Sequence, residues 1–166
     1  MRVGIGFDVH AFTAGRPLVI GGVEIPFELG LAGHSDADVL LHAVADAVLG
    51  AAGERDIGYH FPDTDPALAG VSSLVILQRV GEIIHDAGYN VGNIDSVVIA
   101  QKPKLSPYIE DMRSAIAIAL DIKVEQVMIK ATTTEKLGFT GRGEAIAAQA
   151  VCILNPRILE AKHQGH

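Results

Sequence analysis

Apolar and other residues alternate strictly at the start of the chain. Positions 3, 5, 7 and 9 are apolar, and a period of two is typical of a β-strand with one apolar face. Asp8 and His10 then lie together on the opposite face, because side chains two positions apart in a strand point the same way. We therefore expect a strand that ends in a carboxylate and an imidazole aimed at one point.

The following residues predict a hairpin, a helix and a long loop. The Gly21-Gly22 pair between two short apolar runs predicts a β-hairpin over 17–26. An Ala- and Leu-rich run predicts a helix that Ser35 or Asp36 caps and Gly50 ends. Residues 51–70 show little periodicity and predict a long loop, which in a compact domain usually binds something.

The second half of the chain predicts further helices and strands. The Ser72-Ser73 pair is expected to cap a helix over 74–86, and Ser106-Pro107 to begin another that runs through residue 120. Strands are expected over 94–100, 127–131 and 144–154, with a glycine-rich loop over 138–143.

This order of elements predicts an α+β fold. We expect a two-layer sandwich in which three helices cover one face of a mixed β-sheet. An apolar sheet face left in water costs about 25 cal/mol per Å², so a closed oligomer with its sheets packed around the axis is expected. Residues 1–156 are predicted to form a single domain, and the polar segment 157–166 to be frayed.

Composition and charge narrow the functional classes. Of the 166 residues 49% are hydrophobic, and the mean hydropathy of +0.31 again favours a buried subunit interface. The formal net charge of -7 argues against nucleic acid as a partner. No apolar run is long enough to span a membrane, no signal sequence is evident, and the single cysteine, Cys152, forms no disulfide framework, so a cytoplasmic protein is expected.

A third metal ligand is available in the first helix. His42 is four residues from both Asp38 and Asp46, which places all three on one helix face. With Asp8 and His10, His42 gives two imidazoles and one carboxylate, a set typical of Zn²⁺ with an open fourth position. The two helical aspartates are the expected partners of the second ring nitrogen of His42. A strand-end turn for the Asp-x-His pair and a hydrogen-bonded core histidine remain open as alternatives.

Three carboxylates lie in the long loop. Asp56, Asp63 and Asp65 occur among prolines and glycines, where aspartates usually form turns. The functional alternative is an acidic lid that binds substrate hydroxyls or an oxygen-preferring cation such as Mg²⁺.

A run of hydroxyls follows the strand at 127–131. Residues 132–134 are all threonine and Glu135 follows them; such threonines are either ordinary strand residues or ligands of phosphate oxygens, with Glu135 near a phosphate-bridging Mg²⁺. Further candidates for binding phosphate are Lys102, Lys104 and Arg142, with a solvated surface charge as the usual alternative for each alone. Neither a Walker nor a Rossmann glycine pattern is present.

These segments together match a known pattern. The matching motifs run in order through residues 1–155 and are Gly6-Phe7-Asp8-Val9-His10, Gly33-His34-Ser35-Asp36-Ala37-Asp38, Asp56-Ile57-Gly58, His60-Phe61-Pro62-Asp63-Thr64-Asp65, Ala100-Gln101-Lys102-Pro103-Lys104 and Lys130 through Arg142. In this combination the chain resembles the 2-C-methyl-D-erythritol 2,4-cyclodiphosphate synthase family of the non-mevalonate isoprenoid pathway. The block from Ala131 to Arg142 is the most specific part of the resemblance.

The resemblance implies a reaction and its cofactors. The implied substrate is 4-diphosphocytidyl-2-C-methyl-D-erythritol 2-phosphate, whose 2-phosphate attacks the β-phosphorus and releases the cyclic diphosphate and CMP. The implied cofactors are Zn²⁺ on the β-phosphate and Mg²⁺ or Mn²⁺ bridging the α- and β-phosphates. No protein nucleophile is implied, because folding the substrate in line and stabilising charge are sufficient for phosphoryl transfer.

The resemblance also implies roles for individual residues. Zinc ligands fall on Asp8, His10 and His42, and the Mg²⁺ contact falls on Glu135. His34 and Thr133 carry over as catalytic groups that stabilise the transition state. Substrate contacts carry over to Asp8, His10, His34, Ser35, Asp56, Ile57, Gly58, Phe61, Asp63, Asp65, Phe139 and Arg142. The cytidine pocket carries over to Ala100, Gln101, Lys102, Pro103, Lys104, Leu105, Ser106, Ala131, Thr132 and Thr133.

The family's assembly implies a homotrimer with each active site between neighbouring subunits. In relatives an axial cavity can hold an isoprenoid diphosphate, so the resemblance implies such a ligand here. Gln149 departs from the glutamate that many relatives place opposite Arg142 at this axis, and Leu105-Ser106 replaces a common Met-Leu pair. Two other functions would require the same metal ligands. One is a zinc phosphohydrolase that releases a linear product, and the other is a metal-dependent nucleotide-binding trimer without turnover.

Overall fold

A mixed five-stranded sheet forms one layer of the molecule. The computed structural model describes residues 1–157, and its main sheet has the order β4-β1-β7-β5-β6. The strands are β1 (Arg2–Thr13), β4 (Gly30–Leu31), β5 (Tyr89–Ile99), β6 (Val127–Thr132) and β7 (Ala145–Pro156). Only β5 and β6 run parallel, and the other pairs are antiparallel. The polar segment expected to fray lies outside the described residues except for Arg157.

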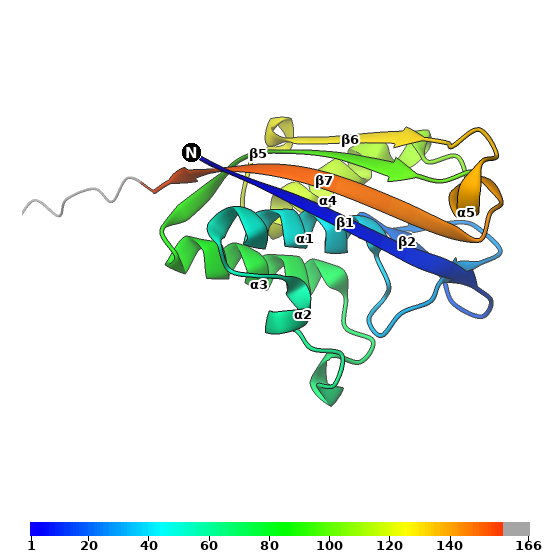
Figure 1. Cartoon of the computed structure of the whole chain (residues 1–166), viewed down its shortest axis with the longest axis horizontal. Helices are drawn as coiled ribbons and strands as arrows, with labels where there is room; N and C mark the ends of the chain where they lie inside the picture. Colours follow the sequence, from blue (N-terminus) through cyan, green and yellow to red (C-terminus); the bar gives the residue numbers. More distant parts are fainter. Residues whose placement is uncertain (158–166) are drawn as a thin grey trace, which may run out of the picture.

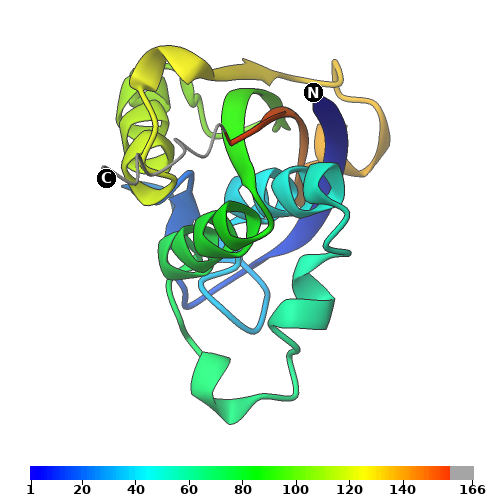
Figure 2. The same cartoon turned by 90° about the vertical axis from the view of Figure 1, so that its left-hand side faces the viewer.

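Three long helices form the second layer. They are α1 (Val39–Ala52), α3 (Ser73–Asp86) and α4 (Ile109–Ala119), and all lie on one side of the sheet (Figure 1). The turned view shows α1 next to the sheet and the segment between α1 and α3 at the end of the molecule farthest from it (Figure 2). The predicted two-layer α+β arrangement is therefore confirmed. Among the described residues, no helix has the length and apolar character to cross a membrane.

Several predicted boundaries are wrong in detail. Asp38, and neither Ser35 nor Asp36, caps α1, and the helix passes Gly50 and ends at Gly53 with a left-handed φ of 82°. The expected loop over 51–70 contains α2 (Ile57–His60) and a 3-10 turn, η1 (Pro66–Leu68).

Short helical turns also replace parts of other predicted segments. The glycine-rich loop contains α5 (Gly138–Gly141), and the predicted helix from residue 106 begins as the 3-10 turn η2 (Ser106–Tyr108). Another such turn, η3 (Val124–Gln126), precedes β6. The reason is local: aspartate, proline and glycine favour single turns that a periodicity search does not detect.

The predicted hairpin is confirmed and supports the start of α1. It consists of β2 (Leu18–Ile20) and β3 (Val23–Ile25), joined by two glycines with φ of 61° and 76°. The amides of Gly21 and Gly22 donate to the two oxygens of the buried Asp38 carboxylate at 2.9 and 2.7 Å. Asp38 thus joins the hairpin turn to the N-terminus of α1.

Two glycines in β1 determine how closely α1 approaches the sheet. A Cβ atom added at Gly4 would lie 2.0 Å from the Ala47 carbonyl oxygen, and one at Gly6 would lie 1.9 Å from the Ala43 carbonyl oxygen. Only glycine permits this contact, because any side chain would overlap the helix backbone. The close packing places His42 of α1 beside Asp8 and His10 of β1.

The apolar stripe of β1 points away from the helices. Val3, Ile5 and Phe7 are each more than half exposed, and Met128 of β6 and Val151 of β7 are also exposed. The core instead forms between α1, α3, α4 and the opposite sheet face. One sheet face of this chain is therefore bare and apolar, as the order of elements predicts.

Candidate metal centre and active site

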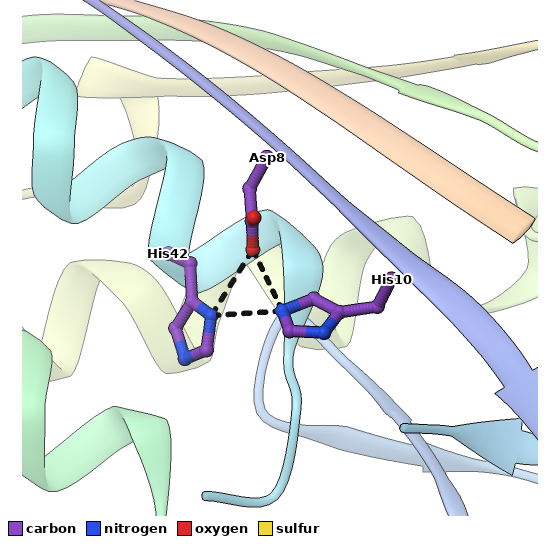
Figure 3. Close-up of side chains that lie close together, drawn as sticks. All are labelled: Asp8, His10 and His42. Carbon is purple, nitrogen blue, oxygen red and sulfur yellow. Dashed lines mark hydrogen bonds and ion pairs between the residues drawn. The ribbon is translucent and has the colours of Figure 1, made fainter. Parts of the chain in front are cut away.

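Three side chains from β1 and α1 converge on one point (Figure 3). Asp8 Oδ2 lies 2.8 Å from His10 Nε2 and 3.1 Å from His42 Nδ1, and the two nitrogens are 3.2 Å apart. Electron-rich atoms at these separations repel one another unless a proton or a cation lies between them. The structure thus brings together the ligand set that the sequence predicts.

Each imidazole in this cluster also has a hydrogen-bond partner at its outer nitrogen. His10 Nδ1 lies 2.6 Å from the Ala32 carbonyl oxygen, which can only accept, so Nδ1 carries the proton and Nε2 has a free lone pair. His42 Nε2 lies 3.0 Å from Ser73 Oγ and 3.2 Å from Ser35 Oγ. If Nε2 donates to these hydroxyls, the Nδ1 lone pair of His42 faces the cluster.

The cluster geometry fits a tetrahedral metal ion. Zinc bonds of about 2.0–2.2 Å place tetrahedral ligand atoms roughly 3.3 Å apart, close to the observed separations. Three protein ligands leave a fourth position open, which is the pattern of a catalytic site. A carboxylate oxygen and two imidazole lone pairs are chemically suited to such an ion.

The electrostatics of the cluster favour an ionised carboxylate. Burial alone would raise the pKa of Asp8, but hydrogen bonds and charge from His10 and His42 outweigh it and lower that pKa to about 2. For His10, burial lowers the pKa, and the Asp8 carboxylate more than offsets this, so the pKa lies above the usual 6.5. In the metal-free protein a proton therefore competes with a metal for His10.

The prediction that Asp38 and Asp46 contact the second ring nitrogen of His42 is wrong. Asp38 accepts its hydrogen bonds from backbone amides at the hairpin turn and the start of α1, and Asp46 Oδ1 accepts from the Ile57 amide at 2.9 Å. The shared helix face is real, but each carboxylate is engaged by a backbone amide of a neighbouring segment. Ser35 and Ser73 instead occupy the position next to His42 Nε2 that was predicted for the two aspartates. Apart from its place at a helix start, nothing in the sequence marks Ser73 for this role.

A pocket of about 410 Å³ opens next to the cluster. All three cluster residues line this pocket, together with Ile76 of α3. The other lining residues are His34, Ser35, Ile57, Gly58, Phe61, Pro62, Asp63 and Leu68. The sequence did not single out Pro62, Leu68 and Ile76, which add apolar wall. A larger hollow of about 730 Å³ between the C-terminal ends of α3 and α4 contains none of the predicted site residues.

Two of the loop aspartates have local structural roles. Asp56 Oδ1 accepts from the Tyr59 amide at 2.9 Å and caps α2, and Asp65 Oδ1 accepts from the Ala67 amide at 2.9 Å and caps η1. These are the turn functions that such aspartates usually have. Asp63 lines the pocket, and neither Asp56 nor Asp65 is among the lining residues.

The predicted cytidine segments lie together elsewhere in the chain. The Ala100 amide donates to the Thr132 carbonyl oxygen at 3.0 Å, and the Lys136 amide donates to Gln101 Oε1 at 3.1 Å. Parallel pairing of β5 and β6 places their C-terminal ends at one edge of the sheet. Thr133 Oγ1 donates to Glu135 Oε1 at 3.0 Å. None of these residues is among the described residues that line the pocket.

Phe139 and Arg142 also lie outside that pocket. Both belong to or adjoin α5, and Arg142 pairs with Glu144 at 2.7 Å on the exposed surface. Most of the predicted site residues therefore form two groups, one at the metal cluster with its pocket and one at the β5–β6 edge.

A scan against family models matches the chain to the YgbB family over residues 1–155. The chain belongs to the YgbB family. The match spans both groups of predicted site residues.

Individual relatives of this YgbB chain carry a consistent name. A Bacillus subtilis (strain 168) protein is 64% identical over 153 residues, covering 92% of this chain and 97% of the relative, and a Lachnospira eligens protein is 61% identical over 155 residues, covering 93% and 85%. Both are named 2-C-methyl-D-erythritol 2,4-cyclodiphosphate synthase. In a structure of IspF from Plasmodium falciparum in complex with CDP, the chain is 34% identical, with a TM-score of 0.82 over 95% of this chain and 97% of that one.

A bifunctional relative is longer than this YgbB chain. The IspDF structure from Campylobacter jejuni is 44% identical with a TM-score of 0.90, covering 93% of this chain and 42% of that one. This chain therefore corresponds to less than half of the bifunctional protein.

Arg16 is another side chain near the YgbB site that sequence reasoning missed. Its Nη1 donates to the Gly33 carbonyl oxygen at 2.5 Å, and its Nη2 donates to the Ser35 carbonyl oxygen. The two carbonyls flank His34, so one guanidinium fixes the backbone on both sides of it. Nothing in the local sequence marks this contact, which joins segments 17 and 19 residues apart.

Proposed function

We propose that this chain is a 2-C-methyl-D-erythritol 2,4-cyclodiphosphate synthase. It converts 4-diphosphocytidyl-2-C-methyl-D-erythritol 2-phosphate into the cyclic 2,4-diphosphate and CMP, as a cyclising phosphorus–oxygen lyase of isoprenoid biosynthesis. The observation that carries the proposal is a metal-ligand cluster and pocket within a chain that is 64% identical, over 92% of its length, to a protein of that name.

The reaction requires positioning more than covalent chemistry. An oxygen of the substrate's 2-phosphate forms a new bond to the β-phosphorus, and the bond from that phosphorus to the bridging oxygen breaks, so CMP leaves with that oxygen. Ser35, Ile57, Gly58, Phe61 and Asp63 line a space that can hold the folded methylerythritol unit. A substrate held with the reacting atoms in line needs no protein nucleophile.

His34 and Thr133 are proposed to stabilise the transition state. His34 lines the pocket and its backbone is fixed on both sides by Arg16. Each side chain can donate a hydrogen bond to equatorial phosphoryl oxygens, on which charge accumulates as the bonds exchange. In this structure the Thr133 hydroxyl donates to Glu135 Oε1 at 3.0 Å, so the hydroxyl proton must leave Glu135 before Thr133 can donate to a phosphoryl oxygen.

Two metal ions are proposed. Asp8, His10 and His42 hold Zn²⁺, which their nitrogen and oxygen atoms suit, and Glu135 contacts Mg²⁺ or Mn²⁺, which prefer oxygen ligands. When bound, these ions supply Lewis-acid stabilisation of phosphoryl oxygens. The orientation of both imidazoles by hydrogen bonds to their outer nitrogens supports this assignment for the first ion.

Each complete site is proposed to form between two chains of a homotrimer. Cytidine would bind at residues 100–106 and 131–133 of one chain, with Phe139 and Arg142 nearby, while the metal cluster comes from its neighbour. The separation of the two groups within one chain and the bare apolar sheet face support this arrangement.

Burial of the bare sheet faces against one another would close the trimer axis. Gln149 is exposed on this face beside Phe7 of β1, and an isoprenoid diphosphate is proposed as the ligand of the axial cavity. We further propose that residues 1–156 form one catalytic domain, that the enzyme works in the cytoplasm, and that it acts without nucleic acid or a membrane.

The products distinguish the proposal from its alternatives. The purified protein is incubated with the diphosphocytidyl substrate, Zn²⁺ and Mg²⁺, and the products are followed by ³¹P NMR. Stoichiometric CMP with a cyclic diphosphate supports the synthase. CMP with a linear diphosphate would instead identify water as the nucleophile and a hydrolase, and CMP binding without turnover would identify a nucleotide-binding module.

A further inference from the structure

Behind His42 lies a part-buried network of hydrogen bonds that continues from Ser73 to Asp36, a residue to which no role has yet been assigned. His42 Nε2 is 3.0 Å from Ser73 Oγ. The Ser73 hydroxyl donates to Asp36 Oδ1, and the Ser73 amide donates to Asp36 Oδ2 at 2.9 Å. Ser73 is only 1% exposed, so water does not compete for its hydroxyl. This hydrogen-bond network joins Ser73 at the start of α3, Asp36 in the loop before α1 and the metal ligand His42.

The direction of the hydrogen bonds in this network follows from the chemistry of its members. An ionised carboxylate can only accept, so the single hydroxyl proton of Ser73 is committed to Asp36. Ser73 Oγ then has only lone pairs to offer to His42, and the proton between them must belong to Nε2. Ser35 Oγ is the weaker partner, because it lies 3.2 Å from Nε2 and also accepts from the Ala37 amide.

A competing arrangement exists on the other side of the ring. Asp8 Oδ2 lies 3.1 Å from His42 Nδ1 and would accept a proton from it. That tautomer places hydrogen where a metal needs the Nδ1 lone pair. We propose that Asp36 and Ser73 are positioning residues that hold His42 in the Nε2–H tautomer and its ring in the metal-binding orientation. The inference rests on the proposed metal site and assigns these two residues to it.

The test compares two substitutions of Ser73 with a neighbouring control. Ser73→Ala removes the hydroxyl, and Ser73→Thr retains it. Ser72→Ala removes the adjacent hydroxyl, which caps α3 by accepting from the Leu74 amide and does not reach His42. Zinc affinity is measured by competition with a chromogenic chelator, and the thermal midpoint of each metal-free variant is recorded.

A second readout reports the tautomer directly. Long-range ¹H–¹⁵N spectra of the metal-free protein at alkaline pH identify which nitrogen of His42 carries the proton. The wild type is expected to show Nε2–H, and Ser73→Ala to shift the population toward Nδ1–H. A purely structural role of Ser73 would alter the thermal midpoint without this shift.

The expected affinity pattern is specific. Ser73→Ala lowers zinc affinity about 10- to 100-fold, the usual effect of removing an outer-sphere partner, while Ser73→Thr and Ser72→Ala remain close to the wild type. Equal affinities for the wild type and Ser73→Ala, or an unchanged tautomer, would overturn the inference. Both measurements omit substrate, so a protein that shows the expected pattern but makes no cyclic product contradicts the proposed function alone.

Discussion

Gly6→Ala tests whether close packing of β1 and α1 builds the metal cluster. The added Cβ would lie 1.9 Å from the Ala43 carbonyl oxygen and 2.8 Å from the Ala47 amide nitrogen. Ordinary contact begins near 3.4 Å, so the helix must retreat by about 1.5 Å to accommodate one methyl group. Because Ala43 follows His42 directly, the same retreat carries the imidazole away from β1.

The expected loss has two components. Overpacking in a rigid core costs typically about 1–3 kcal/mol of unfolding free energy, and the contact here is with backbone, which cannot change rotamer. Metal sites tolerate deviations of only about 0.2 Å in ligand distance, so zinc affinity falls much more steeply than stability does.

Urea denaturation and chelator competition measure the two components of the Gly6→Ala effect. Gly50→Ala is the matched control. Gly50 lies in α1, the helix that packs on Gly6, and an added Cβ there would meet only the Ile5 carbonyl oxygen, at 4.0 Å. The control should be more stable by about 0.5–1 kcal/mol, from helix propensity alone, and should retain zinc. Wild-type zinc affinity in Gly6→Ala would refute the packing argument.

Three other predictions follow from the cluster and the divided site. His42→Ala should lose zinc and activity while leaving the proposed trimer assembled in sedimentation analysis; an active variant with zinc would remove His42 from the ligands. Zinc affinity should fall roughly tenfold per unit as pH drops below the raised pKa of His10, because one proton must then be displaced, and a flat profile by calorimetry would contradict this. Co-expressed His42→Ala and Thr133→Ala chains, each inactive alone, should recover roughly a quarter of wild-type activity if sites form between random neighbours of a trimer; no recovery would place each site within one chain.

Short-range patterns predicted much of this fold. The alternation at residues 3–9, the Gly21-Gly22 turn and the Ser72 cap correspond to β1, the β2–β3 hairpin and the start of α3. Each of these features depends on residues within one turn or one strand of each other, and local sequence carries that information. The alternation also predicted the apolar face of β1. In the structure this face is the bare one, and the glycines of β1 face the helix.

Contacts between segments far apart in the sequence could not be predicted from it. The i, i+4 spacing placed Asp38 and Asp46 correctly on the face of His42, yet it could not reveal that the hairpin turn and the start of α2 hold their carboxylates. Ser73 reaches His42 across 31 positions, and Arg16 reaches Ser35 across 19. Such partners depend on tertiary packing, which spacing within one element does not specify.

Zinc titration of the metal-free protein, with product formation followed by ³¹P NMR, tests the central claim most directly. The claim is that Asp8, His10 and His42 hold a metal ion on which cyclisation of the diphosphocytidyl substrate depends. We predict that the initial rate of cyclic diphosphate formation rises with added zinc and saturates at one equivalent per chain, in the presence of excess Mg²⁺. Full turnover by the zinc-free protein, or a linear product at saturating zinc, would contradict the account.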